Sequence, residues 1–364
     1  MENPDSEAHG RNRFCSQVGV SAVAKGSMNL AKYSRQVLFQ PIGAAGQEKL
    51  LRSQVVIIGC GALGTAQANA LVRAGIGKLR IVDRDYVEES NLQRQLLFDE
   101  SDAAASLPKA IAAKRKLRSI NSDVEVEGIV ADVDSRNVEE QVAGFHVILD
   151  ASDNFETRYL LNDVAVKLAI PWIYGAVVAS YASTMTVLPG RTPCLACVFP
   201  APPEGMHDTC DIVGVISPAV AWTAAIQVTE ALKILLGDEQ KLHGSLLTCD
   251  VWENWYQQTR PQIDPRCRAC GAGDFVHLED AGLTHLTMCG RDSVQIHQRH
   301  SRALDLVALK TRLEKFGRVR GNEFLLRCVL DPYELTVFAD GRAIVKGTRD
   351  AAVARGLYAR YIGS

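Results

Sequence analysis

A run of apolar, β-prone residues that ends in three closely spaced glycines constrains the fold of this chain more than any other feature. Val55–Ile58 lead into Gly59, Gly61 and Gly64, and Ala62–Arg73 then has the composition of a helix. In such a strand–turn–helix unit, two glycines let the backbone turn tightly and approach a phosphate, and the third lets helix and strand pack closely. Free N–H groups at the helix start attract an anion. The pattern therefore predicts a nucleotide-binding α/β fold, although proteins that use NAD, FAD or ATP all build such a loop.

Composition narrows the class of protein. The chain has 364 residues, of which 47% are hydrophobic and 23% charged, as is typical of a soluble protein with about two domains. Its 40 basic and 42 acidic residues give a net charge of -2, so there is no electrostatic footprint for nucleic acid or an anionic membrane. No uninterrupted apolar run approaches the ~20 residues of a membrane span, and the polar N-terminus contains no secretory signal. We expect a cytoplasmic protein without a nucleic-acid or membrane partner.

The N-terminal part divides near residue 30. Residues 1–30 are rich in Ser, Gly, Asn and Arg without periodicity, and we expect a disordered lead-in, with Met28 as an alternative start. The folded part begins near residue 31, and Arg35 follows within a Tyr-Ser-Arg-Gln sequence. On its pattern alone, Arg35 is interpreted as a solvated charge on a short helix.

The second predicted strand ends in an acid. Within Lys78–Asp83, Asp83 lies 24 residues after Gly59. This is close to the spacing at which a carboxylate accepts hydrogen bonds from a ribose. Asp83 is therefore predicted to bind the sugar of the nucleotide.

Polar and basic residues follow this strand. Asn91, Arg94 and Gln95 lie together in one segment, and Lys109 begins the next predicted helix. A guanidinium in bidentate geometry and an ammonium acting as a point charge would clamp a triphosphate. A basic surface loop and a helix start explain the same residues equally well, so the pattern alone leaves both interpretations open.

Another apolar strand, Val147–Asp150, is followed closely by Asp153. Ligands of open α/β sheets bind outside the carboxyl ends of the strands, so Asp153 is placed to meet the nucleotide. A carboxylate there can hold a Mg²⁺ ion that bridges phosphates. Asp153 also suits the N-cap of the helix predicted over 155–169, and one residue can serve both purposes.

Two Cys-x-x-Cys pairs predict a metal site. Cys194 and Cys197 form the first pair, and Cys267 and Cys270 form the second. Two such knuckles build a closed, tetrahedral Cys₄ zinc site with a structural role, and their separation of about 70 residues would staple one domain across its surface. Four independent free thiols are the alternative.

Cys210 belongs to neither pair. It stands on a polar segment near His207, whose protonated ring would help to lower the pKa of the thiol. A free cysteine is more often buried and inert, so the sequence supports either a reactive or a packed thiol.

The composition changes after Gly271. Residues 285–364 are predicted to form a second, small α/β domain with helices over Leu304–Phe316 and Ala351–Tyr361. Between two alternating runs, Asp340-Gly341 indicates a hairpin. No cluster of catalytic residue types occurs in this part of the sequence.

Taken together, these motifs give residues 31–273 a close resemblance to the ThiF/MoeB/HesA family, bacterial relatives of ubiquitin-activating enzymes. The resemblance rests on ordered motifs that include both Cys-x-x-Cys pairs and six others: Tyr33-Ser-Arg-Gln, Gly59-x-Gly-x-x-Gly, Ser90-Asn-Leu-Gln-Arg-Gln, Pro108-Lys-Ala, Asp153-Asn-x-x-Thr-Arg158 and Thr209-Cys-x-x-x-Gly-Val. It implies a Rossmann-like ATP-binding fold that carries a Cys₄ zinc site. It also implies adenylation of the C-terminal glycine of a ubiquitin-like sulfur-carrier protein by ATP and Mg²⁺, with release of pyrophosphate.

The resemblance also implies residue roles. Asp83 would hold the ribose, Asp153 would bind Mg²⁺, and Arg35 would reach the active site of the other subunit in a homodimer. The proposed phosphate ligands are Asn91, Arg94, Gln95 and Lys109. The reaction suits these residue types, because attack by an ionised carboxylate on phosphorus needs charge neutralisation and alignment rather than a base.

The sequence leaves the identity of the partner proteins partly open. Family motifs are shared by enzymes that act on a ThiS-type carrier of thiazole synthesis and on a MoaD-type carrier of molybdopterin synthesis, and we favour the ThiS type. Because the C-terminal domain shows no rhodanese-like cysteine loop, sulfur would come from a separate donor such as a cysteine desulfurase. Cys210 would then form a covalent carrier intermediate or stay unreactive. An NAD-dependent oxidoreductase is a remote alternative that rests on the glycine loop alone.

Overall fold

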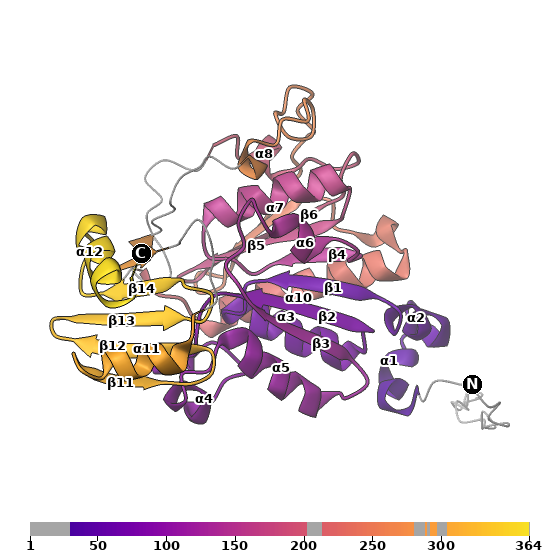
Figure 1. The fold of residues 1–364 in the computed structure, drawn as a ribbon. Helices are drawn as coiled ribbons and strands as arrows, with labels where there is room; N and C mark the ends of the chain where they lie inside the picture. The colour runs from indigo at the N-terminus through magenta and orange to yellow at the C-terminus, as the bar shows by residue number, and fades with distance from the viewer. Residues whose placement is uncertain (1–29, 202–212, 280–287, 290–291, 297–303, 364) are drawn as a thin grey trace, which may run out of the picture.

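A computed structural model gives the structure of the protein and describes residues 30–201, 213–279, 288–289, 292–296 and 304–363 (Figure 1). The predicted lead-in, apart from its last residue, and Cys210 with His207 lie outside the described residues. Two β-sheets organise the described chain, one of eight strands and one of six.

The eight-stranded sheet has the order β3-β2-β1-β4-β5-β6-β7-β8. Its first five strands in this order run parallel, and β6, β7 and β8 join antiparallel. The chain crosses from β1 to β2 on one side and returns to β4 on the other, which is the strand order of a dinucleotide-binding fold. The strands are β1 Gln54–Ile58, β2 Lys78–Asp83, β3 Glu125–Val130, β4 Val147–Asp150, β5 Trp172–Val178, β6 Tyr181–Val187, β7 Leu246–Asp250 and β8 Trp255–Thr259.

Helices cover both faces of this sheet (Figure 1), which is why β1 is apolar from Val55 to Ile58. Val55 and Ile57 pack in one core with α3, α5 and α10, whereas Val56 and Ile58 pack in the other with α6 and α7. A strand buried on both faces needs a continuous apolar run rather than an alternating one. The helices are α3 Ala62–Ala74, α5 Lys109–Ile120, α6 Val138–Val142, α7 Phe155–Leu168 and α10 Ser217–Leu236.

Helix α10 is long and apolar enough to cross a membrane by length and composition alone, and it is the one such helix among the described residues. In the structure it packs against α3 and strands β4, β5 and β6. Two fully buried glutamines fix it there. The Gln67 amide of α3 donates to the Gln227 side chain of α10 at 2.6 Å, and Gln227 in turn donates to the carbonyls of Asp150 and Ile173. The helix is therefore part of the protein core.

The second sheet is antiparallel, with the order β11-β12-β13-β14-β10-β9, and it lies beside one end of the large sheet (Figure 1). One face packs against α11 and α12 in a core that includes Leu309, Leu326, Val337 and Tyr358. The elements are β9 Met288–Cys289, β10 Ser293–Ile296, α11 Leu306–Leu313, β11 Arg318–Gly321, β12 Leu325–Leu330, β13 Tyr333–Phe338, β14 Ala343–Lys346 and α12 Ala351–Tyr361. The predicted hairpin turn at Asp340-Gly341 joins β13 to β14.

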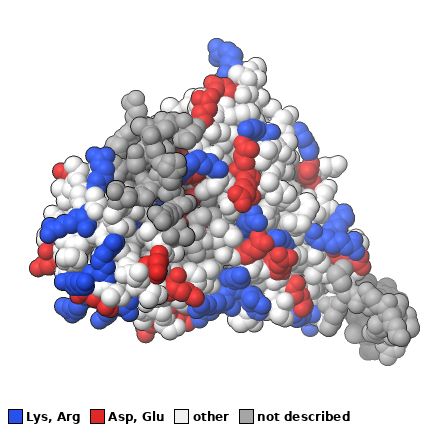
Figure 2. Space-filling view, in the orientation of Figure 1, with Lys and Arg blue, Asp and Glu red and all other residues white. Residues whose placement is uncertain are grey.

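Strand β11 was not expected from the sequence, and it forms an edge of the small sheet. Its Arg318 and Arg320 are exposed, in the region where Lys and Arg gather at the left of Figure 2. Charged side chains on an edge strand discourage pairing with another chain. The edge is therefore protected by its arginines.

Short elements complete the chain and link the larger ones. They are η1 Leu30–Tyr33, α1 Ser34–Val37, α2 Gly43–Leu50, η2 Glu89–Asn91, α4 Glu100–Ala104, α8 Leu195–Val198, η3 Glu239–Lys241 and η4 Val276–Leu278.

Candidate functional site

An open cleft of about 320 Å³ lies at the carboxyl ends of β1, β2, β3 and β4, where the strand order reverses. Ligands of open α/β sheets bind at this switch point. The lining includes most of the residues predicted from the sequence: Gly59, Gly61, Asp83, Asn91, Arg94, Gln95, Lys109 and Asp153. The fold thus brings together in one place segments that are far apart in the sequence.

The three glycines of the loop have different reasons to be glycine. Gly59 has a φ of +99°, and a Cβ there would lie 2.4 Å from the carbonyl oxygen of Ala151. A Cβ on Gly64 would lie 2.1 Å from the carbonyl oxygen of Gly59, so close packing of α3 on the loop requires glycine. Among the described residues, a Cβ on Gly61 would meet only the Gln95 amide, at 3.9 Å. Gly61 therefore leaves space over the cleft that a ligand can occupy.

Asp83 ends β2 and orders the glycine loop. One carboxylate oxygen accepts from the backbone N–H of Cys60 at 2.5 Å, and the other accepts from the N–H of Asp85 at 2.7 Å. Burial raises the pKa of Asp83, and the charge of Asp85 adds to this, although Lys109 acts in the opposite direction. Each oxygen keeps a second lone pair for a ligand hydroxyl.

Lys109 begins α5, and only 8% of it is exposed. Its ammonium donates to Asp85 Oδ2 at 3.2 Å. Burial disfavours the charged form of Lys109, but the carboxylates of Asp85 and Asp83 outweigh it and raise the pKa above its usual range. The cleft therefore holds a permanent cation, and Asp85, which the sequence analysis did not single out, holds it in place.

The segment after β2 presents three predicted residues. Asn91 in η2 is buried, and its side-chain oxygen accepts from the N–H of Glu88 at 3.0 Å. Arg94 donates from Nη1 to the carbonyl of Ser90 at 2.8 Å and lies partly exposed at the cleft. Gln95 is 3% exposed, and its Oε1 has no hydrogen-bond partner among the described residues. An unpartnered buried polar atom beside a cleft favours a ligand or water there.

Asp153 lies in the loop between β4 and α7, and its side chain is exposed at the cleft. It is not the N-cap of α7. Asn154 fills that position instead, with its side-chain oxygen accepting from the N–H of Thr157 at 2.8 Å. Asp153 receives one hydrogen bond, from the amide of Asn154 at 3.1 Å, so its carboxylate faces the cleft with lone pairs to spare.

Two residues beneath this loop were not predicted to have a role. Asp150 is fully buried, accepts from the N–H and hydroxyl of Ser152, and lies 3.5 Å from Nε of Arg158. Arg158 also donates to the carbonyl of Ser152 at 3.0 Å and lines the cleft. Burial raises the pKa of Asp150, while Arg158 counteracts it. Their signal was in the sequence, because Asp150 ends a strand and Arg158 lies one helical turn into α7.

Besides Gly64, which packs against the loop, two residues predicted for the nucleotide site do not line the cleft that the structure describes. Arg35 is exposed on α1 and is absent from the lining of the cleft. Cys210 lies outside the described residues.

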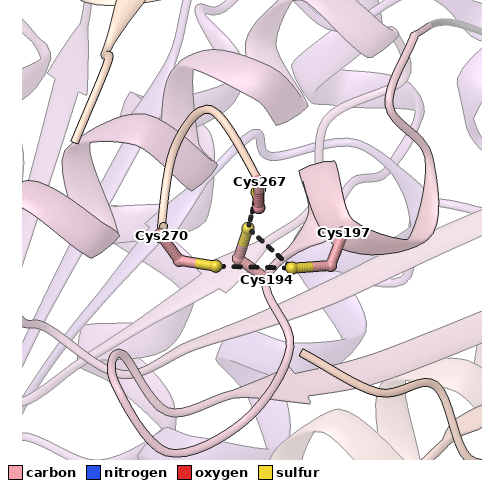
Figure 3. Close-up of side chains that lie close together, drawn as sticks. All are labelled: Cys194, Cys197, Cys267 and Cys270. Carbon is pink, nitrogen blue, oxygen red and sulfur yellow. Dashed lines mark hydrogen bonds between the residues drawn. The ribbon is translucent and has the colours of Figure 1, made fainter. Parts of the chain in front are cut away.

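The four cysteines of the two knuckles converge on one point (Figure 3). The sulfur atoms of Cys194 and Cys267 are 3.5 Å apart and those of Cys197 and Cys270 are 3.3 Å apart, and all four lie within 4.8 Å of one another. A tetrahedral Zn–S₄ centre with bonds of about 2.3 Å has edges of about 3.8 Å. These distances are too long for disulfides and fit a metal centre.

The chemistry of these donors also fits a cation. Burial raises the pKa of the Cys194 thiol to about 11, so the thiolate form needs a nearby positive charge. Helix α7 positions both knuckles. Its Asn162 accepts from the N–H of Leu195 at 2.8 Å, and its buried Asp163 accepts two hydrogen bonds from the guanidinium of Arg268. The centre thus ties distant segments to one helix, away from the cleft, which is consistent with a structural role.

A doubly wound sheet with a glycine loop and several charged side chains in its cleft, together with a separate cluster of four cysteines that could hold a metal ion, defines a nucleotide-binding α/β protein. The model of the ThiF family matches residues 33–270. The chain therefore belongs to the ThiF family.

Relatives span most of the chain. The sulfur carrier protein ThiS adenylyltransferase of Bacillus subtilis (strain 168) is 48% identical over 336 residues, which cover 91% of this chain and 99% of that protein. The SAMP-activating enzyme E1 of Haloferax volcanii is 41% identical, covering 69% of this chain and 92% of its own length. Among solved structures, Escherichia coli MccB with ATP has a TM-score of 0.58 at 26% identity, covering 67% of this chain and 75% of that one.

Proposed function

We propose that this protein is a nucleotidyltransferase that uses ATP to adenylate the C-terminal glycine of a ubiquitin-like sulfur-carrier protein of the ThiS type. The observation that carries the proposal is the cleft in which Lys109, Arg94 and Asp153 surround the glycine loop. The extent of similarity to the Bacillus subtilis ThiS adenylyltransferase supports the choice of carrier. The reaction would serve thiazole formation in thiamine biosynthesis, in the cytoplasm.

The charges of the cleft favour a triphosphate over a dinucleotide. Gly61 leaves room at the N-terminus of α3, where free N–H groups attract phosphate. Arg94 and the buried Lys109 supply two further positive charges to the lining of the cleft. If the protein were an NAD-dependent oxidoreductase, the positions of Arg94 and Lys109 would be unexplained. The MccB structure with ATP supports the same choice of nucleotide.

The residues of the cleft suit attack of a carboxylate on the α-phosphorus. The carrier's terminal carboxylate is ionised at pH 7 and needs no general base. One of its oxygens would bond to the α-phosphorus while the bond to the bridging oxygen breaks, so that pyrophosphate leaves. Lys109, whose pKa is raised, stays protonated and stabilises charge that develops on the phosphates. Asp83 would hold the ribose, and Asn91, Arg94 and Gln95 would align the phosphates.

Asp153 is proposed to hold the Mg²⁺ that accompanies ATP. Its carboxylate is exposed at the cleft and is engaged by one amide only. Oxygen ligands and retained waters are what Mg²⁺ prefers, usually with one or two carboxylates from the protein. Arg158 and Asp150 would keep the loop that carries Asp153 in place.

The four knuckle cysteines are proposed to hold Zn²⁺, which would supply no chemistry to the reaction. The division of the chain into 31–273 and 285–364 is also proposed, with the first part as the adenylyltransferase domain.

A homodimer is proposed because Arg35 on α1 is exposed and does not line the cleft of its own chain. Beside it, Leu38 and Phe39 are 73% and 60% exposed. Apolar side chains exposed side by side favour a protein interface. In a dimer, Arg35 of one subunit would reach the phosphates bound by the other.

Sulfur is proposed to come from a separate donor such as a cysteine desulfurase. In the C-terminal part, Cys328 is fully buried, and burial raises the pKa of its thiol. Cys328 therefore offers no accessible thiolate. The variant Cys210→Ser tests whether Cys210 forms a covalent intermediate with the carrier.

The choice of carrier is tested by ATP–pyrophosphate exchange with purified carriers. We expect exchange with a ThiS-type carrier at a kcat/KM well above that with a MoaD-type carrier. A higher kcat/KM with the MoaD type would replace the ThiS type by the molybdopterin alternative. Exchange with neither carrier, together with tight binding of NAD, would favour the oxidoreductase.

A further inference from the structure

The C-terminal sheet forms one wall of the nucleotide cleft. Ser293 of β10 and Ile344 and Lys346 of β14 line the cleft together with the glycine loop. All three lie beyond residue 270, where the match to the ThiF family model ends. The cleft of this chain therefore contains a wall that the matched family region does not supply.

The sheet is docked on the segment that follows Asp83. Tyr86 is 4% exposed and packs in one cluster with Leu325, Phe338 and Ile344 of the small sheet. Its ring lies 6.5 Å from that of Phe338. A buried aromatic anchor of this kind makes a well-packed contact. The position of Tyr86, three residues after the predicted ribose ligand, depends on this contact.

An ion pair continues the contact toward the phosphate-binding residues. Lys346 Nζ donates to Glu88 Oε1 at 2.6 Å, and both side chains are about one-third exposed. Glu88 is the N-cap of η2, and its side chain accepts from the N–H of Asn91 while Asn91 accepts from the N–H of Glu88. Lys346 therefore holds the residue that fixes Asn91 and begins the turn leading to Arg94.

Further hydrogen bonds hold both ends of the segment between Asp83 and Lys109. Near its start, Arg342 donates to the carbonyl of Arg84 at 3.3 Å. Near its end, Asn322 donates to the carbonyls of Ala105 and Ser106 at 3.0 and 3.2 Å. The small sheet thus contacts this segment at its beginning, middle and end.

We propose that the C-terminal domain is a structural part of the ATP site, and that Lys346 is a positioning residue that acts through Glu88 on Asn91 and Arg94. The inference rests on the proposed function, because it assigns ATP as the ligand of the cleft. The domain pre-organises the segment that binds the phosphates, so less order has to be gained when ATP binds. Removal of the Lys346 charge therefore weakens ATP binding.

The test compares Lys346→Met with Lys346→Arg and with Lys310→Met in the full chain. Lys310 is a matched control, because it lies on α11 of the same domain and, among the described residues, forms one ion pair, with Glu314 at 4.0 Å. We measure the Kd for ATP by calorimetry and the KM for ATP and for the carrier in pyrophosphate exchange. We expect Lys346→Met to raise both ATP constants about three- to tenfold, in line with one partly buried ion pair, with an unchanged KM for the carrier. Lys346→Arg and Lys310→Met should bind ATP like the wild type.

A double-mutant cycle separates positioning from direct contact with ATP. Glu88→Gln removes the charge that pairs with Lys346 but keeps a side-chain oxygen that can accept from the N–H of Asn91. If Lys346 acts through Glu88, Lys346→Met weakens ATP binding much less in the Glu88→Gln background than in the wild type. An equal loss of affinity in both backgrounds, in variants that unfold at the wild-type temperature, would overturn the positioning role. Wild-type ATP affinity in Lys346→Met would overturn the inference while leaving the proposed function intact. A wild-type protein that binds no ATP would instead contradict the proposed function, and this inference with it.

Discussion

Replacing Lys109 by methionine tests the proposed electrostatics of the cleft most sharply. Methionine fills much of the same buried volume, so the substitution removes a charge without leaving a large cavity. Asp85 then loses the ammonium that donates to its Oδ2 at 3.2 Å and neutralises its charge. The cleft of the variant therefore lacks the positive charge of Lys109. The negative charge of Asp85, no longer neutralised by Lys109, also repels a phosphate.

The size of the effect follows from the position of Lys109. At about 4 Å, an effective dielectric constant of about 20 gives an attraction of about 4 kcal/mol between an ammonium and a phosphate charge. Loss of one pre-organised electrostatic contact typically costs about 10²–10³ in rate. We expect a loss of this size in carrier-dependent pyrophosphate exchange, because only 8% of Lys109 is exposed and water screens the contact little.

The pKa of Lys109 gives the expected pH dependence. The folded state raises this pKa above its unfolded value of about 10.4. The ammonium is therefore fully charged below about pH 10.4. It loses its proton only as the pH rises through the pKa of the folded state. The deficit of Lys109→Met should therefore be constant from about pH 6 to about pH 9. A deficit that shrank within that range would assign the titration to another group.

The control is Lys116→Met on the same helix. Lys116 pairs with Asp99 and Asp102 at the surface and does not line the cleft. The Lys116→Met variant should therefore catalyse pyrophosphate exchange at the wild-type rate. Exchange by Lys109→Met within about threefold of wild type, in a variant with native circular dichroism and unchanged carrier binding, would refute the role of Lys109 as a phosphate ligand, since it would fall far short of the expected loss.

Three further predictions concern the metal, the dimer and the thiol. Freshly purified protein should contain one Zn²⁺ per chain, and Cys267→Ser should lower the melting temperature more than it lowers exchange per folded molecule; protein free of zinc would exclude the metal centre. Mixing inactive Arg35→Ala with inactive Asp153→Ala subunits should restore part of the activity, because one composite site regains both residues. If the mixture stays inactive although size-exclusion chromatography shows a dimer, Arg35 does not act across the interface. Cys210→Ser should exchange pyrophosphate normally but transfer sulfur to the carrier more slowly and form no reductant-sensitive adduct; carrier thiocarboxylate formed at the wild-type rate would make Cys210 an unreactive thiol.

The sequence predicted the parts of the site that depend on local backbone geometry. Gly59, Asp83 and Lys109 stand at the ends of strands or the start of a helix, and strand order then brings such ends together. The convergence of Cys194 with Cys267 could also be predicted, because two knuckles of this type commonly bind one shared metal ion.

Other parts of the site depend on contacts between distant segments and could not be predicted. Asp85 holds Lys109 from 24 residues away, and the choice of Asn154 over Asp153 as N-cap depends on the loop conformation. The contact of Lys346 with Glu88 joins residues 258 apart, and no periodicity or spacing encodes it. Packing of the small sheet on Tyr86 decides that contact, and packing of this kind can be seen only in the folded chain.

The most direct test of the central claim is the intact mass of a ThiS-type carrier after incubation with this protein, ATP and Mg²⁺. A pyrophosphatase in the mixture removes the second product and draws the reaction forward. The account predicts a carrier heavier by one adenylyl group, and no change in a carrier that lacks its C-terminal glycine. A carrier of unaltered mass, with protein that is folded and binds ATP, would contradict it.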